Sequence, residues 1–198
     1  MTHYIYAIIG PSGAGKSTIT DAVFKKTSQI VSFTSRDPRP GEKEGIDYYF
    51  IGKKSPQELE QMKQDCNNGK LVELVEYNHN VYGYATNEIL SKFDPKSKSA
   101  AAIVTLEGYF NLKNSQFGDY IIPVFVYASR STIKNHLKKR NDTPDNILKR
   151  LSLYEAEAKN KEWFDKLEAR KIFISTDSDD IPTITQNFKA KITQYEKD

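Results

Sequence analysis

The chain of 198 residues lacks several features that would place it in a special class of protein. A single cysteine, Cys66, excludes an internal disulfide and is typical of an inert thiol in a reducing cytoplasm. There is no secretory signal pattern and no apolar run of membrane-spanning length, so we expect no membrane partner. No charge sign dominates, since 29 Lys and Arg against 26 Asp and Glu leave a net charge of +3. This balance excludes an extended electrostatic surface for nucleic acid, and any basic function must be local.

Repeats and low-complexity segments are also missing, and short apolar runs alternate with helical patterns instead. At this length we expect one domain. Buried strands are predicted at Tyr4 to Ile9, Ala100 to Leu106, Ile121 to Tyr127 and Lys171 to Ser175. Helices are predicted at Lys16 to about Lys26, Ile147 to Phe164 and Ile181 to Tyr195. Strands separated by crossover material predict an α/β fold, with a mostly parallel sheet flanked by helices.

The segment IIGPSGAGKSTIT matches the pattern G-x-x-x-x-G-K-[ST] between a predicted strand and a predicted helix. In that context the pattern indicates a P-loop, whose backbone N–H groups and helix N-terminus bind phosphate. Lys16 would reach the β and γ phosphates of ATP, and the Ser17 hydroxyl would bind Mg2+. A glycine-rich turn without a ligand is the alternative. The candidate phosphate-binding residues are Gly10, Ser12, Gly13, Ala14, Gly15, Lys16, Ser17 and Thr18.

A P-loop alone does not distinguish motors, GTPases and kinases, so the polar stretch SFTSRDPRPGEKEGIDYYF, residues 32–50, has to decide. The planar guanidinium groups of Arg36 and Arg39 suit a phosphate monoester. Tyr48 would add a phenolic hydrogen bond to the same oxygens. Glu42 would fix an arginine rotamer. Taken alone, the stretch is equally consistent with a solvated loop of mixed charge.

The next polar segment, LVELVEYNHNVYGYA, alternates like strand material and spans residues 71–85. Its Glu73, if buried, would accept hydrogen bonds from the two adjacent N–H groups on the Watson–Crick edge of guanine. Adenine has no such pair of donors on that edge. Tyr82 would supply a second phenol to the monophosphate. The alternatives are a surface position for Glu73 and a core aromatic at Tyr82.

Two of these motifs make the chain resemble the guanylate kinases over nearly its whole length. GPSGAGKST is similar to their phosphate loop, and SFTSRDPRPGEKEGIDYYF is similar to their signature S-x-T-[ST]-R-x-P-R-x-G-E-x-x-G-x-D-Y-x-F. The resemblance implies a P-loop NTPase core at about 1–32, 91–129 and 161–198. It also implies a small β-rich monophosphate-binding subdomain at about 33–90 and a helical lid at about 130–160.

The same resemblance implies roles for particular side chains. Two lid arginines, Arg140 and Arg150, would approach the transferring phosphoryl group from the side opposite the P-loop and act with Lys16. Ser32 and Glu73 would contact guanine. The GMP phosphate would be held by Arg36, Arg39, Tyr48 and Tyr82.

The chain departs from the family pattern at three places. The family carries Asp-x-Asp before a Gln-Gly pair, whereas this chain reads AAIVTLEGYF, with Thr105 and Glu107 as its polar residues. Tyr84 stands where the family has a small hydroxyl residue that touches guanine. His136 stands where an arginine on the ATP side is expected. The residues expected to hold phosphate are therefore all present, while several of those expected to contact the base are altered. Two interpretations stay open: an altered or broader base preference, or a lower rate in an otherwise normal guanylate kinase.

The leading hypothesis is an enzyme that uses ATP and Mg2+ to phosphorylate a nucleoside monophosphate, with GMP or dGMP preferred. Asp94, Glu107 or a water would then replace the missing acids. A second hypothesis is a guanylate-kinase-like module that binds nucleotides or phosphorylated proteins without turnover, although the intact P-loop favours catalysis. A kinase of altered base specificity and a kinase for a phosphorylated sugar are further alternatives. We expect a monomer or homodimer that binds no nucleic acid.

Overall fold

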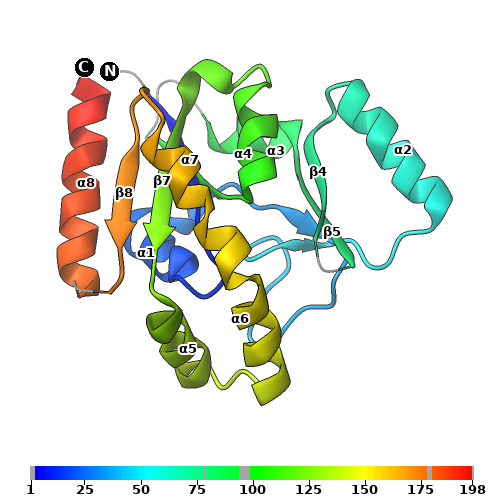
Figure 1. The fold of residues 1–198 in the computed structure, drawn as a ribbon. Helices are drawn as coiled ribbons and strands as arrows, with labels where there is room; N and C mark the ends of the chain where they lie inside the picture. The colour runs from blue at the N-terminus through cyan, green and yellow to red at the C-terminus, as the bar shows by residue number, and fades with distance from the viewer. Residues whose placement is uncertain (1–2, 78, 94–98, 178–179, 198) are drawn as a thin grey trace.

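The computed structural model describes residues 3–77, 79–93, 99–177 and 180–197, and it contains two sheets with helices packed around them (Figure 1). In the first sheet the strands lie in the order β6-β1-β7-β8, and all neighbours are parallel. These strands are β1 (Ile5–Ile9), β6 (Ala100–Ile103), β7 (Ile121–Tyr127) and β8 (Ile172–Ser175). The predicted α/β fold with a parallel sheet flanked by helices is confirmed.

Side chains of β1 alternate between two cores, one on each face of the parallel sheet. Tyr6 and Ile8 pack in the core formed with α1, α5 and α8, whereas Ile5, Ala7 and Ile9 pack in the core formed with α3, α4 and α7. All five residues of β1 are buried. Full burial stabilises the fold by roughly 1.5–3 kcal/mol for each large apolar side chain, so both faces of this strand are committed to packing.

Eight α-helices and two short 3-10 helices are assigned within the described residues. The α-helices are α1 (Lys16–Val23), α2 (Pro56–Asn67), α3 (Thr86–Lys92), α4 (Leu106–Lys113), α5 (Arg130–Lys139), α6 (Pro144–Ala158), α7 (Asn160–Asp165) and α8 (Ile181–Lys197). The 3-10 helices are η1 (Lys26–Ser28) and η2 (Gly118–Tyr120). The helix predicted at residues 147–164 is thus two helices, α6 and α7, and the strand predicted to reach Leu106 ends at Ile103.

The second sheet is formed within the segment predicted to be β-rich and has the strand order β3-β2-β5-β4. Its strands are β2 (Phe33–Thr34), β3 (Tyr49–Phe50), β4 (Leu71–Tyr77) and β5 (Asn80–Ala85). Strands β4 and β5 form an antiparallel hairpin. The same segment also contains α2, which the sequence reading did not anticipate. A reciprocal capping box begins this helix, in which Ser55 and Glu58 each accept from the other's backbone N–H.

The phosphate-loop sequence leaves β1 at a point where the chain passes very close to β7. Gly10 has a φ of 144°, and a Cβ added there would lie 2.1 Å from the carbonyl oxygen of Val126. Only glycine fits such an approach without displacing the backbone of β7. The loop is therefore anchored beside the carboxyl ends of the two central parallel strands, which is the usual ligand-binding edge of such a sheet.

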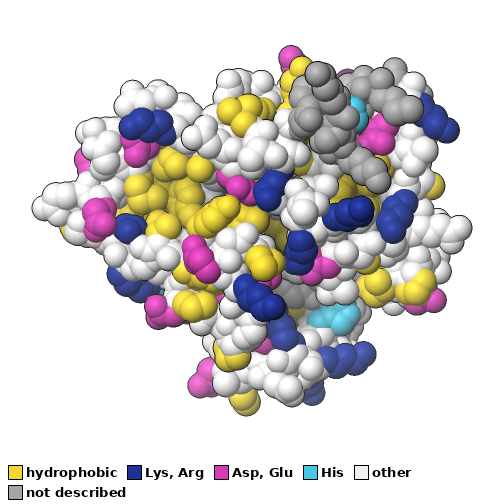
Figure 2. Space-filling model, turned by 180° about the vertical axis from the view of Figure 1, so that it is seen from behind, with side chains coloured by type: hydrophobic (Ala, Val, Ile, Leu, Met, Phe, Trp, Pro, Cys, Tyr) yellow, Lys and Arg dark blue, Asp and Glu magenta, His cyan; other side chains and the backbone are white. Residues whose placement is uncertain are grey.

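The surface shows no extended region of one charge on the face seen in Figure 2, where Lys and Arg side chains are interspersed with Asp and Glu. This distribution agrees with the balanced composition of the chain. None of the helices within the described residues is both long enough and apolar enough to cross a membrane.

Candidate active site

The P-loop sequence connects β1 to α1 and directs the N-terminus of α1 toward open space. Gly15 adopts a left-handed conformation, with a φ of 95°, immediately before the helix. The first backbone N–H groups of a helix have no acceptor within the helix, and they carry its partial positive charge. In this structure the Lys16 ammonium donates to the carbonyls of Gly10 (2.6 Å) and Pro11 (3.0 Å). Burial lowers the pKa of Lys16 to about 8, an effect that Glu157 opposes and Arg150 reinforces.

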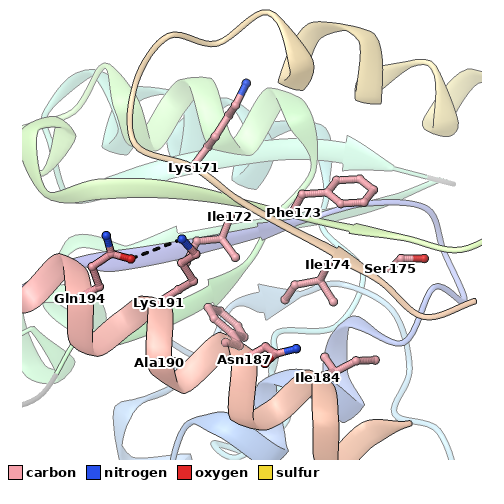
Figure 3. A pocket seen from close by; sticks show the side chains of 11 residues that line it. Lys171, Ile172, Phe173, Ile174, Ser175, Ile184, Asn187, Ala190, Lys191 and Gln194 are labelled. Atoms are coloured by element: carbon pink, nitrogen blue, oxygen red, sulfur yellow. Dashed lines mark hydrogen bonds between the residues drawn. The ribbon is translucent and has the colours of Figure 1, made fainter. Parts of the chain in front are cut away.

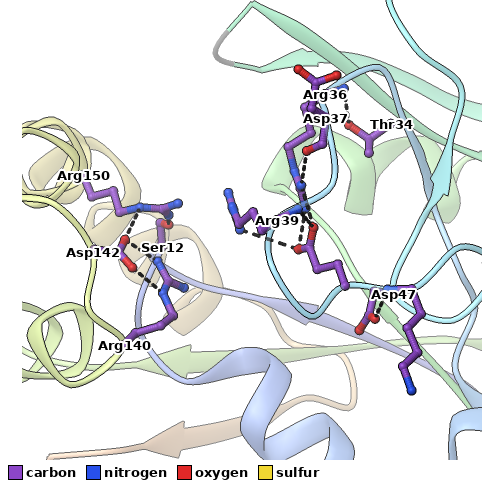
Figure 4. A network of polar contacts seen from close by, with 11 residues as sticks. Ser12, Thr34, Arg36, Asp37, Arg39, Asp47, Arg140, Asp142 and Arg150 are labelled. Carbon is purple, nitrogen blue, oxygen red and sulfur yellow. Dashed lines mark hydrogen bonds and ion pairs between the residues drawn. The ribbon is translucent and has the colours of Figure 1, made fainter.

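The loop that follows β2 brings Arg36, Arg39 and Glu42 together (Figure 4). Both oxygens of Glu42 accept from the Arg36 guanidinium at 2.7 Å, and one also accepts from the Arg39 backbone N–H at 2.8 Å. Burial acts to lower the pKa of Arg36, but the hydrogen bonds to Glu42 outweigh burial and raise it. The Arg39 side chain remains 51% exposed. Glu42 therefore fixes Arg36 with short bonds, while the half-exposed Arg39 guanidinium forms only a longer ion pair with Glu42, at 3.9 Å.

Two tyrosines complete this cluster. The Arg36 guanidinium lies over the Tyr48 ring, 4.7 Å from its centre, in a cation–π contact. The Tyr48 and Tyr82 rings meet edge to face, with their centres 6.2 Å apart. Burial raises the pKa of the Tyr48 phenol. The structure thus brings together all the side chains that the sequence assigned to the monophosphate.

The segment predicted as a lid supplies a second network, centred on an acid that the sequence reading did not single out. Asp142 accepts from Nε and Nη2 of Arg140 at 2.6 and 2.5 Å, and it lies 3.4 Å from Nε of Arg150. Arg150 also donates to the Ser12 hydroxyl of the P-loop. Arg150 is therefore in contact with the P-loop, and Arg140 is linked to it through Asp142.

The two networks face one another, and Arg39 points toward the side on which Arg150 and Ser12 lie (Figure 4). Arg140 lowers the pKa of Asp142, and Arg150 and Arg39 lower it further. Asp142 raises the pKa of Arg140, and Glu42 adds to this effect. Side chains from the two networks are thus close enough to influence each other's charge.

A cavity of about 160 Å³ opens between the P-loop helix and the loop after β2. Ser17 and Thr20 line it from α1, and Arg39, Glu42 and Tyr48 line it from the other side. Ser32 and Tyr84 also line this cavity. Of the predicted monophosphate-site residues, Ser32, Arg39, Glu42 and Tyr48 therefore share one cavity with the start of α1.

Glu73 does not line that cavity. It is only 4% exposed, and its carboxylate packs against Gly108, where an added Cβ would lie 2.1 Å from Oε1. Its Oε2 is buried without a hydrogen-bond partner. Burial raises the pKa of Glu73 to about 8, and the nearby Glu107 adds to this rise. The surface-strand interpretation of Glu73 is therefore wrong, and the buried acid carries a proton at neutral pH.

Tyr84 on β5 pairs with Glu73 on β4, and it also lines the cavity. It is 3% exposed, and its hydroxyl donates to the Ile103 carbonyl at 2.8 Å. Burial raises the pKa of Tyr84 well above its usual value, Glu73 reinforces the rise, and a hydrogen bond with Ser32 opposes it. The phenol is therefore in contact with the residues that the sequence assigned to the base.

The other departures from the family pattern have local structural roles. Thr105 caps α4, where its hydroxyl accepts from the Gly108 N–H at 3.0 Å. His136 lies on α5, and its Nδ1–H donates to the Gly13 carbonyl of the P-loop at 2.9 Å. Glu107 is exposed in the first turn of α4, near Glu73. Asp94, the other candidate replacement acid, lies outside the described residues.

A larger cavity of about 390 Å³ lies elsewhere, between β8 and α8 (Figure 3). Its lining includes Ile172, Ile174 and Ile184, together with polar side chains such as Lys191, which donates to Gln194 at 3.3 Å. None of the candidate site residues lines it. Several of the candidate site residues line the smaller cavity instead.

Comparison with known proteins gives a consistent result. The guanylate kinase family model matches residues 2–190. The chain is 32% identical to guanylate kinase of Sus scrofa over 156 residues, which cover 75% of this chain and 73% of that protein. It is 31% identical to guanylate kinase of Fusobacterium nucleatum over 162 residues, which cover 79% and 83%.

The fold is also shared with a solved structure, the crystal structure of guanylate kinase from Anaplasma phagocytophilum. The two structures match with a TM-score of 0.65 at 21% sequence identity, covering 98% of this chain and 86% of that chain. A parallel sheet with a P-loop, joined to a second sheet, defines the chain as a P-loop nucleoside monophosphate kinase. The chain belongs to the guanylate kinase family. The resemblance stated from the sequence is confirmed.

The burial of Glu73 leads us to predict how the stability of the folded protein depends on pH. The folded protein keeps the carboxyl proton up to about pH 8, whereas the ordinary pKa of 4.5 means that the unfolded chain releases it much earlier. Because the folded state binds more protons between these values, this group's contribution to stability is lost as pH rises toward 8. Glu73→Gln should therefore be more stable than the parent at pH 8.5, by about 2 kcal/mol or more, and should differ little at pH 4.5.

Urea unfolding followed by circular dichroism at both pH values measures this difference. Glu76→Gln, on the exposed side of the same strand, is the matched control and should show no pH-dependent gain. Equal stability of Glu73→Gln and the parent at pH 8.5 would contradict a buried protonated acid.

Proposed function

We propose that the protein transfers the γ-phosphoryl group of ATP to a purine nucleoside monophosphate, GMP or dGMP, by direct in-line attack. The proposal rests on two arginine networks that face one another (Figure 4). One consists of Arg36 and Arg39 with Glu42, and the other of Arg140 and Arg150 with Asp142. The second network adjoins the P-loop through Ser12, and the first lines the cavity beside α1. Two anionic substrates bound at these networks would have their phosphates next to one another, which is the geometry that phosphoryl transfer needs.

In this proposal the second sheet and its loops form the monophosphate-binding subdomain at about 33–90. Arg39 binds the monophosphate directly, because its exposed side chain lines the cavity. The same phosphate is also held by Arg36, which Glu42 fixes in place, and by the phenols of Tyr48 and Tyr82. A rigid arginine loses less side-chain entropy on binding than a free one.

The transfer step needs cations more than it needs a base, because the attacking phosphate oxygen is already ionised near neutral pH. The backbone amides of residues 15–18 at the start of α1 and the Lys16 side chain hold the ATP phosphates. Arg140 and Arg150, on the proposed lid at about 130–160, neutralise charge that develops on the transferring group. Closure of the lid excludes water, so that the phosphoryl group is not lost to hydrolysis.

Magnesium fits this site as an ion that arrives with ATP. Within the described residues, no group of three or more His, Cys, Asp or Glu side chains could form a metal cage. Ser17 lines the cavity in the first turn of α1, so its hydroxyl would supply one protein ligand to Mg2+, and substrate phosphates would supply others. Bound there, Mg2+ would screen the phosphate charges.

Base recognition is assigned to Ser32 and Glu73. Guanine would need the Glu73 carboxylate as an acceptor, so its binding requires the loss of the proton that burial retains. Tyr84, the strand partner of Glu73, lines the cavity and Glu73 does not, which favours a kinase of altered base specificity as the second candidate function. The homodimer or monomer state and the cytoplasmic location stay predictions.

The direct test is ADP formation from ATP and Mg2+ with GMP, dGMP, AMP, CMP, UMP and dTMP supplied separately. We expect turnover with GMP or dGMP, and Lys16→Ala should abolish it by removing the cation that bridges the ATP phosphates. Turnover only with another monophosphate would support the second candidate. Binding of ATP without turnover on any monophosphate would contradict both and favour a non-catalytic binding module.

Arg39→Ala tests the monophosphate site. Loss of a direct charged contact should raise the KM for the monophosphate and lower kcat, for a combined loss of about 10²-fold in kcat/KM. Lys43→Ala removes an exposed cation from the same loop and is the matched control. An unchanged kcat/KM for Arg39→Ala in steady-state assays would exclude this role.

Tyr84→Ser tests the base pocket. Removing the phenol opens space beside Ser32 and supplies the small hydroxyl typical of the family, so the ratio of kcat/KM for GMP to that for AMP should rise by about tenfold. The ratio is insensitive to any fraction of unfolded enzyme. Tyr84→Phe, which keeps the ring, should leave the ratio unchanged. An unchanged ratio in Tyr84→Ser would assign Tyr84 to packing alone.

A further inference from the structure

Ser12 of the P-loop is held by two residues of the lid helix α6 at once. Arg150 donates to its hydroxyl, and the carboxylate of Glu157 accepts from its backbone N–H at 2.8 Å. Arg150 and Glu157 are seven residues apart, which is about two helical turns, so both lie on the same face of α6. Tyr154 lies between them on that face and is buried. A single helix face therefore fixes one P-loop residue through two different groups.

Glu157 lies where an acid is unfavourable for the helix alone. It is in the last turn of α6, where the helix macrodipole favours cations by typically 0.3–1 kcal/mol. Lys16 acts against this penalty, since its charge interacts favourably with the Glu157 carboxylate, and Arg150 is a second cation that contacts the same P-loop residue, Ser12. The contact with the P-loop, and not the stability of the helix, therefore explains why an acid stands at position 157.

The hydrogen bond from Ser12 does not use the donors at the start of α1. Those donors belong to residues 15–18, whose N–H groups precede the first intrahelical bond, from Ile19 to the Gly15 carbonyl. Ser12 lies earlier in the loop, on the side of α6. The carboxylate can therefore remain in place when phosphate binds at the helix N-terminus.

We propose that Glu157 is a positioning residue for phosphoryl transfer. It accepts from the Ser12 backbone N–H and offsets the positive charge of Lys16 and Arg150. In this way it keeps the P-loop and Arg150 correctly placed relative to each other. The inference rests on the proposed roles of Lys16 and Arg150. It assigns to Glu157 no contact with either substrate. Its effect on the reaction is exerted through Ser12, Lys16 and Arg150.

Three variants of the full chain test the proposal. Glu157→Ala removes both the acceptor and the charge, and Glu157→Gln keeps an acceptor for the Ser12 N–H without the charge. Glu155→Gln removes a charge from an exposed position on the same helix and is the matched control. Thermal unfolding of each variant establishes that the folded enzyme is compared.

The expected result is a split between kinetic constants. Relative to the parent, kcat should fall about 100-fold in Glu157→Ala and about tenfold in Glu157→Gln, while the KM for the monophosphate stays within about twofold. The control should behave like the parent. A purely structural role would lower the unfolding temperature without this graded loss. If kcat of folded Glu157→Ala equals that of the control, the proposal is overturned.

A binding experiment separates this proposal from the proposed function. Calorimetric affinity for a non-hydrolysable ATP analogue needs no phosphoryl acceptor, and we expect it to weaken about tenfold in Glu157→Ala but not in Glu155→Gln. If the parent transfers no phosphoryl group, the proposed function fails, and these affinities still decide on Glu157. Equal affinities in both variants would overturn the positioning role.

Discussion

Repulsion between like charges is the constraint on which the site depends. Five cations belong to the P-loop and to the two arginine networks beside it, and two unit charges 4 Å apart repel by about 4 kcal/mol at an effective dielectric constant of 20. Each of them lies beside an acid: Glu42, Asp142 or Glu157. The protein can hold this concentration of positive charge before substrates arrive because the acids offset it. The five cations are Lys16, Arg36, Arg39, Arg140 and Arg150.

Local sequence signals were sufficient for the parallel sheet and the P-loop. A buried strand followed by glycines and a helix is specified within about twenty residues, so β1, the loop and α1 could be predicted. Helix α2 could also have been found, because Ser55 and Glu58 form a capping box that is readable in the sequence. The boundary between α6 and α7 could not, because the apolar spacing continues through the junction between the two helices.

The side chains of the site could be identified in the sequence by their chemical groups, but only the folded structure shows how they are arranged. Glu42 and Arg36 are six residues apart, so their pairing was within reach of sequence reasoning. Glu157 contacts Ser12 across 145 residues, and nothing local marks that pair. The burial of Glu73 similarly depends on Gly108, which belongs to a helix formed later in the chain. Long-range packing, which decides which polar residues are desolvated, carries little local signal.

One hydrogen bond joins the two sheets directly. The Tyr84 hydroxyl on β5 donates to the Ile103 carbonyl at the end of β6, so a point on the second sheet is fixed to a point on the first. The second sheet is also held by α4, which packs against β4 and brings Gly108 against the Glu73 carboxylate. Two separate attachments fix the orientation of a body as well as its position. A movement that brings Arg39 toward the P-loop while keeping both attachments is therefore a bending of the loop after β2, and the sheet that carries Tyr84 stays with the core.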